Sequence, residues 1–226
     1  MNITRFLATT ALGAIMMTGL TAQSVAFEAG DWVVRGGLGY IAPNDDSGAV
    51  TGVPGSGVSV DDSATFAFTA GYMFTDSVGL ELLGIWPANH DVDGEGVLPG
   101  LGINNVGDLD VFPPTLSVNY YFLPGSNWRP HIGAGINYTT YFDVSASAQT
   151  RAALGPGTDL DIDDSIGLAF NAGIDYLVND RFFLSAGLWY VDMSADATLT
   201  GTAAGNLPVD IDVDPFVFML GGGIRF

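Results

Sequence analysis

Eight segments of this chain alternate between apolar and polar residues with the two-residue period of a β-strand. They cover Asp31–Ala42, Ala64–Thr75, Val78–His90, Pro113–Leu123, Trp128–Phe142, Asp164–Val178, Arg181–Met193 and Asp214–Phe226. A tilted strand needs about 9 to 11 residues to cross a bilayer, and each segment reaches that length. The pattern therefore predicts eight strands that could each span a membrane.

The connections between these segments alternate in length. Three are short turns, at Thr75–Ser77, Pro124–Asn127 and Asn179–Asp180. The others run to about twenty residues, which is long for a compact soluble domain. Outer-membrane barrels have short periplasmic turns, long extracellular loops and an even number of strands, so both termini are expected in the periplasm.

The last predicted strand shows which face would meet lipid. Alternate residues counted back from the C-terminus form an apolar row: Phe226, Ile224, Gly222, Leu220, Phe218 and Phe216. Lipid offers the backbone no hydrogen-bond partner, so strands can span it only as a closed barrel. We expect an all-β fold, an eight-stranded antiparallel transmembrane β-barrel. A soluble β-sandwich also alternates, but its loops are more equal in length.

The N-terminus has the pattern of a signal peptide that is cleaved after residue 26. Arg5 supplies a positive charge, residues 6–20 are mostly apolar, and Ser24–Ala26 fits a small-x-small cleavage site. An uncleaved anchor is the alternative. Residues 27–226 would then form a single barrel domain, and no later apolar run is long enough for a spanning helix.

The charge balance is strongly acidic, with 25 acids against 6 bases, which argues against a nucleic-acid partner. The absence of cysteine excludes disulfides. Most acids fall in the four long connections. Alternating carboxylates could hold Ca²⁺ or Mg²⁺ at Asp159, Asp161 and Asp163 or at Asp210, Asp212 and Asp214. Solvated loop acids are the favoured interpretation, and no metal or cofactor is expected.

The inward row of the strands divides into two zones by height. Two bases and two acids near the periplasmic end form a predicted charged plug: Arg35, Glu81, Asp175 and Arg225. Buried charges need partners, so these should pair. Toward the extracellular end lies a predicted apolar cup: Ile41, Leu83, Ile85, Trp189, Val191, Met193, Val217 and Met219. Eight strands enclose room for side chains or one small ligand, so an aqueous ion pore is not expected.

Several segments resemble the OmpW family of outer-membrane proteins: Val78–Leu83, Pro113–Leu116, Gly133–Thr140, Asp175–Leu177, Trp189–Tyr190 and Asp214–Met219. The resemblance implies an eight-stranded barrel in the outer membrane of a Gram-negative bacterium, with an apolar interior that admits small hydrophobic compounds. The C-terminus also resembles the signal read by the barrel-assembly machinery, through Gly221, Ile224 and Phe226. Met219 departs from that signal, because a polar residue is usual there.

Together these observations favour a barrel that binds or passively conducts small hydrophobic solutes through the apolar cup. A packed hydrophobic core is the alternative interpretation of the cup. A structural or adhesive barrel acting through its acidic loops is the alternative function. No enzyme is expected: His90 lies beside Asp91 without a serine placed with it, and His131 lies at the other end. Expected partners are membrane lipids, lipopolysaccharide, the assembly machinery and hydrophobic solutes.

Overall fold

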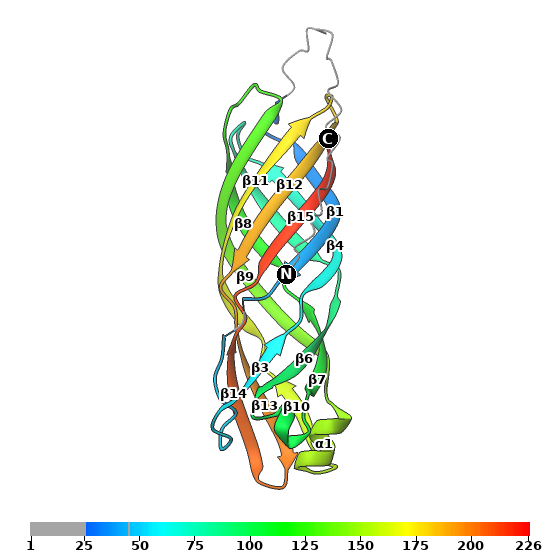
Figure 1. Ribbon diagram of the computed structural model, residues 1–226. Helices are drawn as coiled ribbons and strands as arrows, with labels where there is room; N and C mark the ends of the chain where they lie inside the picture. The colour runs from blue at the N-terminus through cyan, green and yellow to red at the C-terminus, as the bar shows by residue number, and fades with distance from the viewer. Residues whose placement is uncertain (1–25, 45) are drawn as a thin grey trace, which may run out of the picture.

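The computed structural model describes residues 26–44 and 46–226, and these form an antiparallel barrel of eight strands (Figure 1). The strands of the ring are β1 (Trp32–Ala42), β4 (Ser63–Met73), β5 (Val78–Ile85), β8 (Thr115–Tyr121), β9 (Trp128–Ala146), β11 (Ser165–Leu177), β12 (Phe182–Val191) and β15 (Phe216–Arg225). Each pairs with its neighbours in the order β1-β4-β5-β8-β9-β11-β12-β15, and β15 pairs back with β1. The predicted fold is confirmed. The predicted signal peptide, except Ala26, lies outside the described residues.

The two ends of the barrel differ in their connections. Short turns join β4 to β5, β8 to β9 and β11 to β12 at one end, where β1 also begins and β15 ends (Figure 1). We call this the short-turn end and the opposite one the long-loop end. None of the helices in the described segments is long and apolar enough to cross a membrane.

The long connections are folded, which differs from the loops that the sequence analysis expected. They contain β2 (Asp46–Ser47), β3 (Ser56–Val60), β6 (Ala88–Gly96), β7 (Asn105–Phe112), β10 (Asp159–Ile162), β13 (Ser194–Thr202), β14 (Gly205–Asp212), the 3-10 turn η1 (Pro99–Leu101) and α1 (Ala148–Leu154). Strands β7, β6 and β3 continue the sheet from β9, while β10, β13, β14 and β2 form a second sheet (Figure 1).

Alternation explains why these acidic segments form strands. In β7, the buried Leu109 stands between Asp108 and Asp110, so the carboxylates face outward and the apolar side chains face inward. The same alternation recurs in β10 and β14. The inward side chains form one cluster, here called the loop core, which includes Ala169 and Val191 from the barrel strands. The sheets therefore extend the barrel interior beyond the spanning strands.

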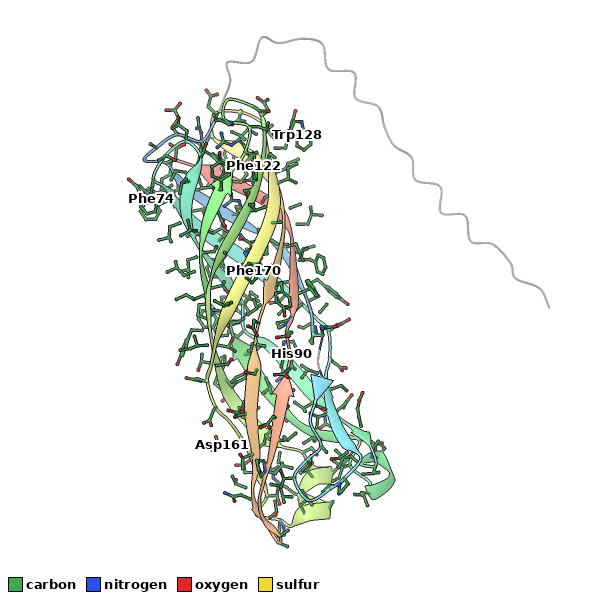
Figure 2. All side chains as sticks on the ribbon, turned by 90° about the vertical axis from the view of Figure 1, so that its left-hand side faces the viewer. Phe74, His90, Phe122, Trp128, Asp161 and Phe170 are labelled. Atoms are coloured by element: carbon green, nitrogen blue, oxygen red, sulfur yellow. The ribbon has the colours of Figure 1, made fainter. Side chains whose placement is uncertain are left out.

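The outer wall of the ring is apolar, as the face assignment predicted. Phe216, Phe218 and Leu220 of β15 are exposed, and Leu220 is 71% exposed. Aromatic side chains gather on the wall near the short-turn end, where Figure 2 labels Phe74, Phe122 and Trp128; Phe170 lies farther along the wall. Outward aromatic residues at such a level are typical of the lipid–water boundary.

Candidate functional site: an apolar cavity above a charged layer

The short-turn end of the interior is closed by an apolar layer. Its residues are Phe27, Val33, Met73, Tyr121, Leu177 and Phe183. The Phe27 ring is fully buried and meets the rings of Tyr121 and Phe183 edge-on, with centroid separations of 5.7 and 5.4 Å. The segment before β1 therefore folds back into the mouth of the barrel and fills it.

Arg35 holds the centre of the charged layer above this closure. Its Nη1 lies 2.5 Å from Glu81 Oε2, and its Nη2 lies 2.6 Å from Asp175 Oδ2. The same Nη2 donates a hydrogen bond to the Tyr121 hydroxyl at 3.1 Å. The Arg35, Glu81 and Asp175 side chains are at most 1% exposed, so each charge depends on the others for solvation. Three of the four predicted plug residues are thus in contact.

The fourth predicted plug residue, Arg225, lies apart, and its placement in the plug was wrong. Its Nη1 is 3.1 Å from Asp31 Oδ2, with side chains that are 15% and 21% exposed. Arg225 stands opposite Val33 at the very end of the β1–β15 ladder, so its side chain reaches the rim. The alternation along a strand shows which face a side chain occupies, but it does not show how deep in the barrel that side chain lies.

Arg129 is a buried base that the sequence analysis missed. It is 0% exposed, its guanidinium carbon lies 5.4 Å from the Phe27 ring centroid, and it donates to the carbonyl of Asp76. Arg129 is two residues before His131 on the same face of β9, so alternation could have identified it. Arg129 therefore joins the closure of the short-turn end, where a cation over an aromatic face is favourable.

Two asparagine amides form the next layer, farther from the short-turn end. Asn171 Nδ2 donates to Asn119 Oδ1 at 2.9 Å. Asn119 lies on β8 and Asn171 lies on β11. Both are paired with Gly133 of β9, and their side chains meet in front of it. A Cβ atom on Gly133 would come within 1.7 Å of Asn119 Oδ1, so only glycine permits this contact.

The predicted apolar cup divides into two groups. Six of its residues line a cavity that continues into the loop core: Ile41, Leu83, Ile85, Val191, Met193 and Val217. Trp189, which is paired with Val217, and Met219 pack with the cup but do not line the cavity. The Trp189 ring lies over Gly187, which is nearer to the short-turn end. A Cβ atom on Gly187 would come within 2.4 Å of that ring. It therefore forms part of the floor.

The cavity has a volume of about 70 Å³. Its lining is almost wholly aliphatic and comes from the barrel and from both sheets of the long-loop end, including Leu109, Val111 and Ile211. The polar residues in the lining are His90, Thr115 and Tyr141. This composition is that of a site for apolar ligands.

No group of three or more histidine or carboxylate side chains with metal-binding geometry occurs in residues 26–44 and 46–226. Asp159 and Asp161 alternate with inward apolar residues on β10 and face outward; Figure 2 labels Asp161 near the long-loop end.

The ring is closed and antiparallel, with an aromatic outer wall, short turns at one end and a charged interior layer. These features define a transmembrane β-barrel of the outer-membrane class. The sequence model of the OmpW family of proteins matches residues 28–226 of this chain. The chain therefore belongs to the OmpW family.

Individual relatives agree with this assignment. Outer membrane protein W of Vibrio cholerae is 38% identical over 220 residues, which are 96% of this chain and 99% of that protein. The crystal structure of the outer membrane protein OprG from Pseudomonas aeruginosa has a TM-score of 0.82 and 34% identity, and covers 89% of this chain and 98% of that one. The dibenzothiophene metabolism operon protein PahQ of Pseudomonas aeruginosa is 30% identical over 146 residues, 65% of this chain and 64% of that protein.

The protein is accordingly an outer-membrane barrel surrounded by lipid. Its short-turn end faces the periplasm, and its long-loop end faces the cell exterior. The relatives from Vibrio cholerae and Pseudomonas aeruginosa named outer membrane protein W and OprG are outer-membrane proteins.

Proposed function

We propose that this barrel binds small hydrophobic molecules from the cell exterior and conducts them passively, without catalysis. The observation that carries the proposal is the cavity at the long-loop end, whose lining is almost wholly aliphatic. Each Å² of apolar surface that leaves water contributes about 25 cal/mol, so such a cavity favours apolar solutes without needing specific contacts. The name of the relative PahQ, which refers to dibenzothiophene metabolism, supports this class of cargo.

The interior below the cavity disfavours a straight passage into the periplasm. A solute would have to displace the Arg35 ion pairs, which stabilise one another in a low-dielectric interior, and then the Phe27 ring. We therefore infer that cargo leaves sideways, between strands, into the membrane.

The strand pair β5–β8 is the place where a sideways exit is expected. Its ladder ends at Leu83 and Thr115, and the β6–β7 pairing begins only at Ala88 and Val111. Prolines 87, 113 and 114 fall in this interruption and donate no ladder hydrogen bond. Pro113 and Thr115 also line the cavity, so the interrupted ladder borders the ligand space.

A charged residue in the cavity tests the proposed binding. Val217→Lys should abolish uptake of an apolar probe such as naphthalene by cells that express the protein, because the ammonium group would be buried in an aliphatic lining. Ala204→Lys places the same charge at the exposed β13–β14 turn and is the matched control. Folded Val217→Lys protein with parental uptake would reject the cavity as the route.

A crosslink tests the exit. Leu83 and Thr115 are directly paired, so cysteines at both positions can form a disulfide across β5 and β8. Oxidation should lower uptake, and reduction should restore it. The control places the disulfide between the paired, lipid-facing residues Leu38 and Leu220, across the continuous β1–β15 ladder. Equal uptake by oxidised and reduced protein would place the exit elsewhere.

The remaining expected partners follow from the position of the barrel in the outer membrane. We propose that the acidic long-loop end lies among lipopolysaccharide molecules. We also propose that the C-terminal residues Gly221, Ile224 and Phe226 are read by the assembly machinery. Phe226 is 68% exposed, and its backbone pairs with Trp32 at the start of β1. Its side chain therefore remains accessible at the seam between the first and last strands.

A further inference from the structure

Two polar side chains face into the cavity from opposite sides of one strand. His90 of β6 is paired with Leu109 of β7, and Tyr141 of β9 is paired with Val111 of β7. Because Leu109 and Val111 both face inward, His90 and Tyr141 occupy diagonal positions on the same inner face. The two side chains therefore line the cavity from the two strands that flank β7.

The His90 ring is held in place at one of its nitrogen atoms. Its Nδ1 lies 3.0 Å from the carbonyl oxygen of Asp61, and the residue is 4% exposed. Among the described residues, its Nε2 makes no hydrogen bond. Figure 2 shows His90 between the barrel and the tip of the long-loop end, at the level where the two parts of the interior join. The ring therefore presents an unused polar atom to the ligand space.

The Tyr141 hydroxyl is buried and has no hydrogen-bond partner among the described residues. A tyrosine hydroxyl keeps its proton at neutral pH, so it can donate a hydrogen bond. A buried hydroxyl without a partner costs about 1 to 3 kcal/mol. A pure hydrocarbon in the cavity would leave that cost in place, whereas a ligand oxygen would remove it.

The charge of the protein limits which oxygen-bearing ligands can enter. The chain has 25 acidic against 6 basic residues, and outward carboxylates follow β7 and β10 around the cavity. An anionic ligand would approach against this negative field and would then be buried in a lining that contains no arginine or lysine. Neutral oxygen groups have neither disadvantage.

We propose that the cavity selects neutral molecules that carry one hydroxyl or carbonyl oxygen on an otherwise apolar body, with that oxygen bound between Tyr141 and His90. The proposal rests on the proposed function and narrows its substrate class. The ligand's oxygen accepts from the Tyr141 hydroxyl. Because His90 Nδ1 donates to the Asp61 carbonyl, a ligand hydroxyl can donate to Nε2, which orients the apolar body toward Val217 and the barrel.

The test compares toluene, benzyl alcohol and benzoate, which share one ring and differ in the polar group. Binding to the full-length mature protein in lipid nanodiscs is measured by calorimetry, with empty nanodiscs subtracted. Tyr141→Phe removes only the hydroxyl and keeps the ring. It should weaken binding of benzyl alcohol by about threefold to tenfold, the equivalent of one net hydrogen bond, and leave toluene binding unchanged. Benzoate should bind more weakly than benzyl alcohol.

Tyr40→Phe is the matched control, because the Tyr40 hydroxyl bonds Asp62 on the outside of the barrel at 2.6 Å. It should change none of the three affinities. His90→Leu provides a second, independent variant with the same expected selectivity. If Tyr141→Phe and His90→Leu fold and bind benzyl alcohol and toluene as the parent does, the polar subsite is refuted while the apolar cavity stands. If the parent binds none of the three compounds, the proposed function itself fails.

Discussion

Replacing Arg35 by methionine tests whether the buried ion pairs of the barrel stabilise it. The substitution keeps an unbranched side chain of similar length but removes the charge between Glu81 and Asp175. Both carboxylates are at most 1% exposed and lie 2.5 and 2.6 Å from the guanidinium group, so neither can recover its solvation from water. Breaking a buried pair in this way costs about 3 to 5 kcal/mol.

The assay is urea unfolding of the protein in lipid vesicles, followed by tryptophan fluorescence. Arg35→Met should lower the free energy of unfolding by about 3 to 5 kcal/mol. The same substitution at the exposed Arg181 is the control and should change it by less than about 0.5 kcal/mol.

A triple variant separates the loss of charge pairing from the loss of packing. Arg35→Met combined with Glu81→Gln and Asp175→Asn leaves no unpaired charge, so it should recover most of the lost stability. Parental stability of Arg35→Met would refute the account of the charged layer. A triple variant no more stable than the single one would show that packing, not charge, is what Arg35 contributes.

Three further predictions concern other parts of the molecule. Phe27→Ala should lower the free energy of unfolding in the same assay by about 3 to 5 kcal/mol, because the ring is fully buried; an unchanged value would mean that the mouth is not closed by this residue. Gly133→Ala should cost about 1 to 3 kcal/mol by separating the two bonded asparagine amides in front of it, and unaltered stability would contradict that contact. Exchanging Asp159, Asp161 and Asp163 for asparagine should leave the Tm as insensitive to Ca²⁺ as in the parent; a Ca²⁺-dependent rise in the parental Tm that the variant loses would show a metal site instead.

The spanning strands could be predicted closely because their environment imposes a strict alternation. Lipid on one side and a filled interior on the other leave no freedom in register, so β1, β11 and β12 begin and end within two residues of the expected bounds. The third predicted strand extended too far, since β5 ends at Ile85 before Trp86 and Pro87.

The folded long-loop end could have been recognised from the same alternation. Acidic residues at every second position were interpreted as solvated loops, yet the intervening residues, such as Leu109 and Leu160, are apolar and buried. A strand whose outward face is carboxylate has the same period as one whose outward face is lipid-exposed. Only the chemistry of the outward residues differs, and it indicates water in place of lipid.

The candidate site was only partly accessible to sequence reasoning. The contact of Arg35 with Glu81 and Asp175 follows from strand faces and height, and these are set by the barrel. Arg225 lies outside the charged layer because of its depth in the barrel, and His90 and Tyr141 flank one strand because of the path of β7. The alternation along a strand determines neither the depth nor the path. The pairing between the strands of the long connections joins residues far apart in the sequence, so it could not be derived before those connections were known to be folded.

If the cavity above Trp189 is the ligand site, anomalous scattering should locate a bromine-labelled ligand there. Crystals of the protein soaked with 1-bromonaphthalene should show a bromine peak between Val111, Val217 and Ile211, inside the cavity. A peak found only on the lipid-facing wall, for example in the groove beside Leu38 and Leu220, would contradict the account.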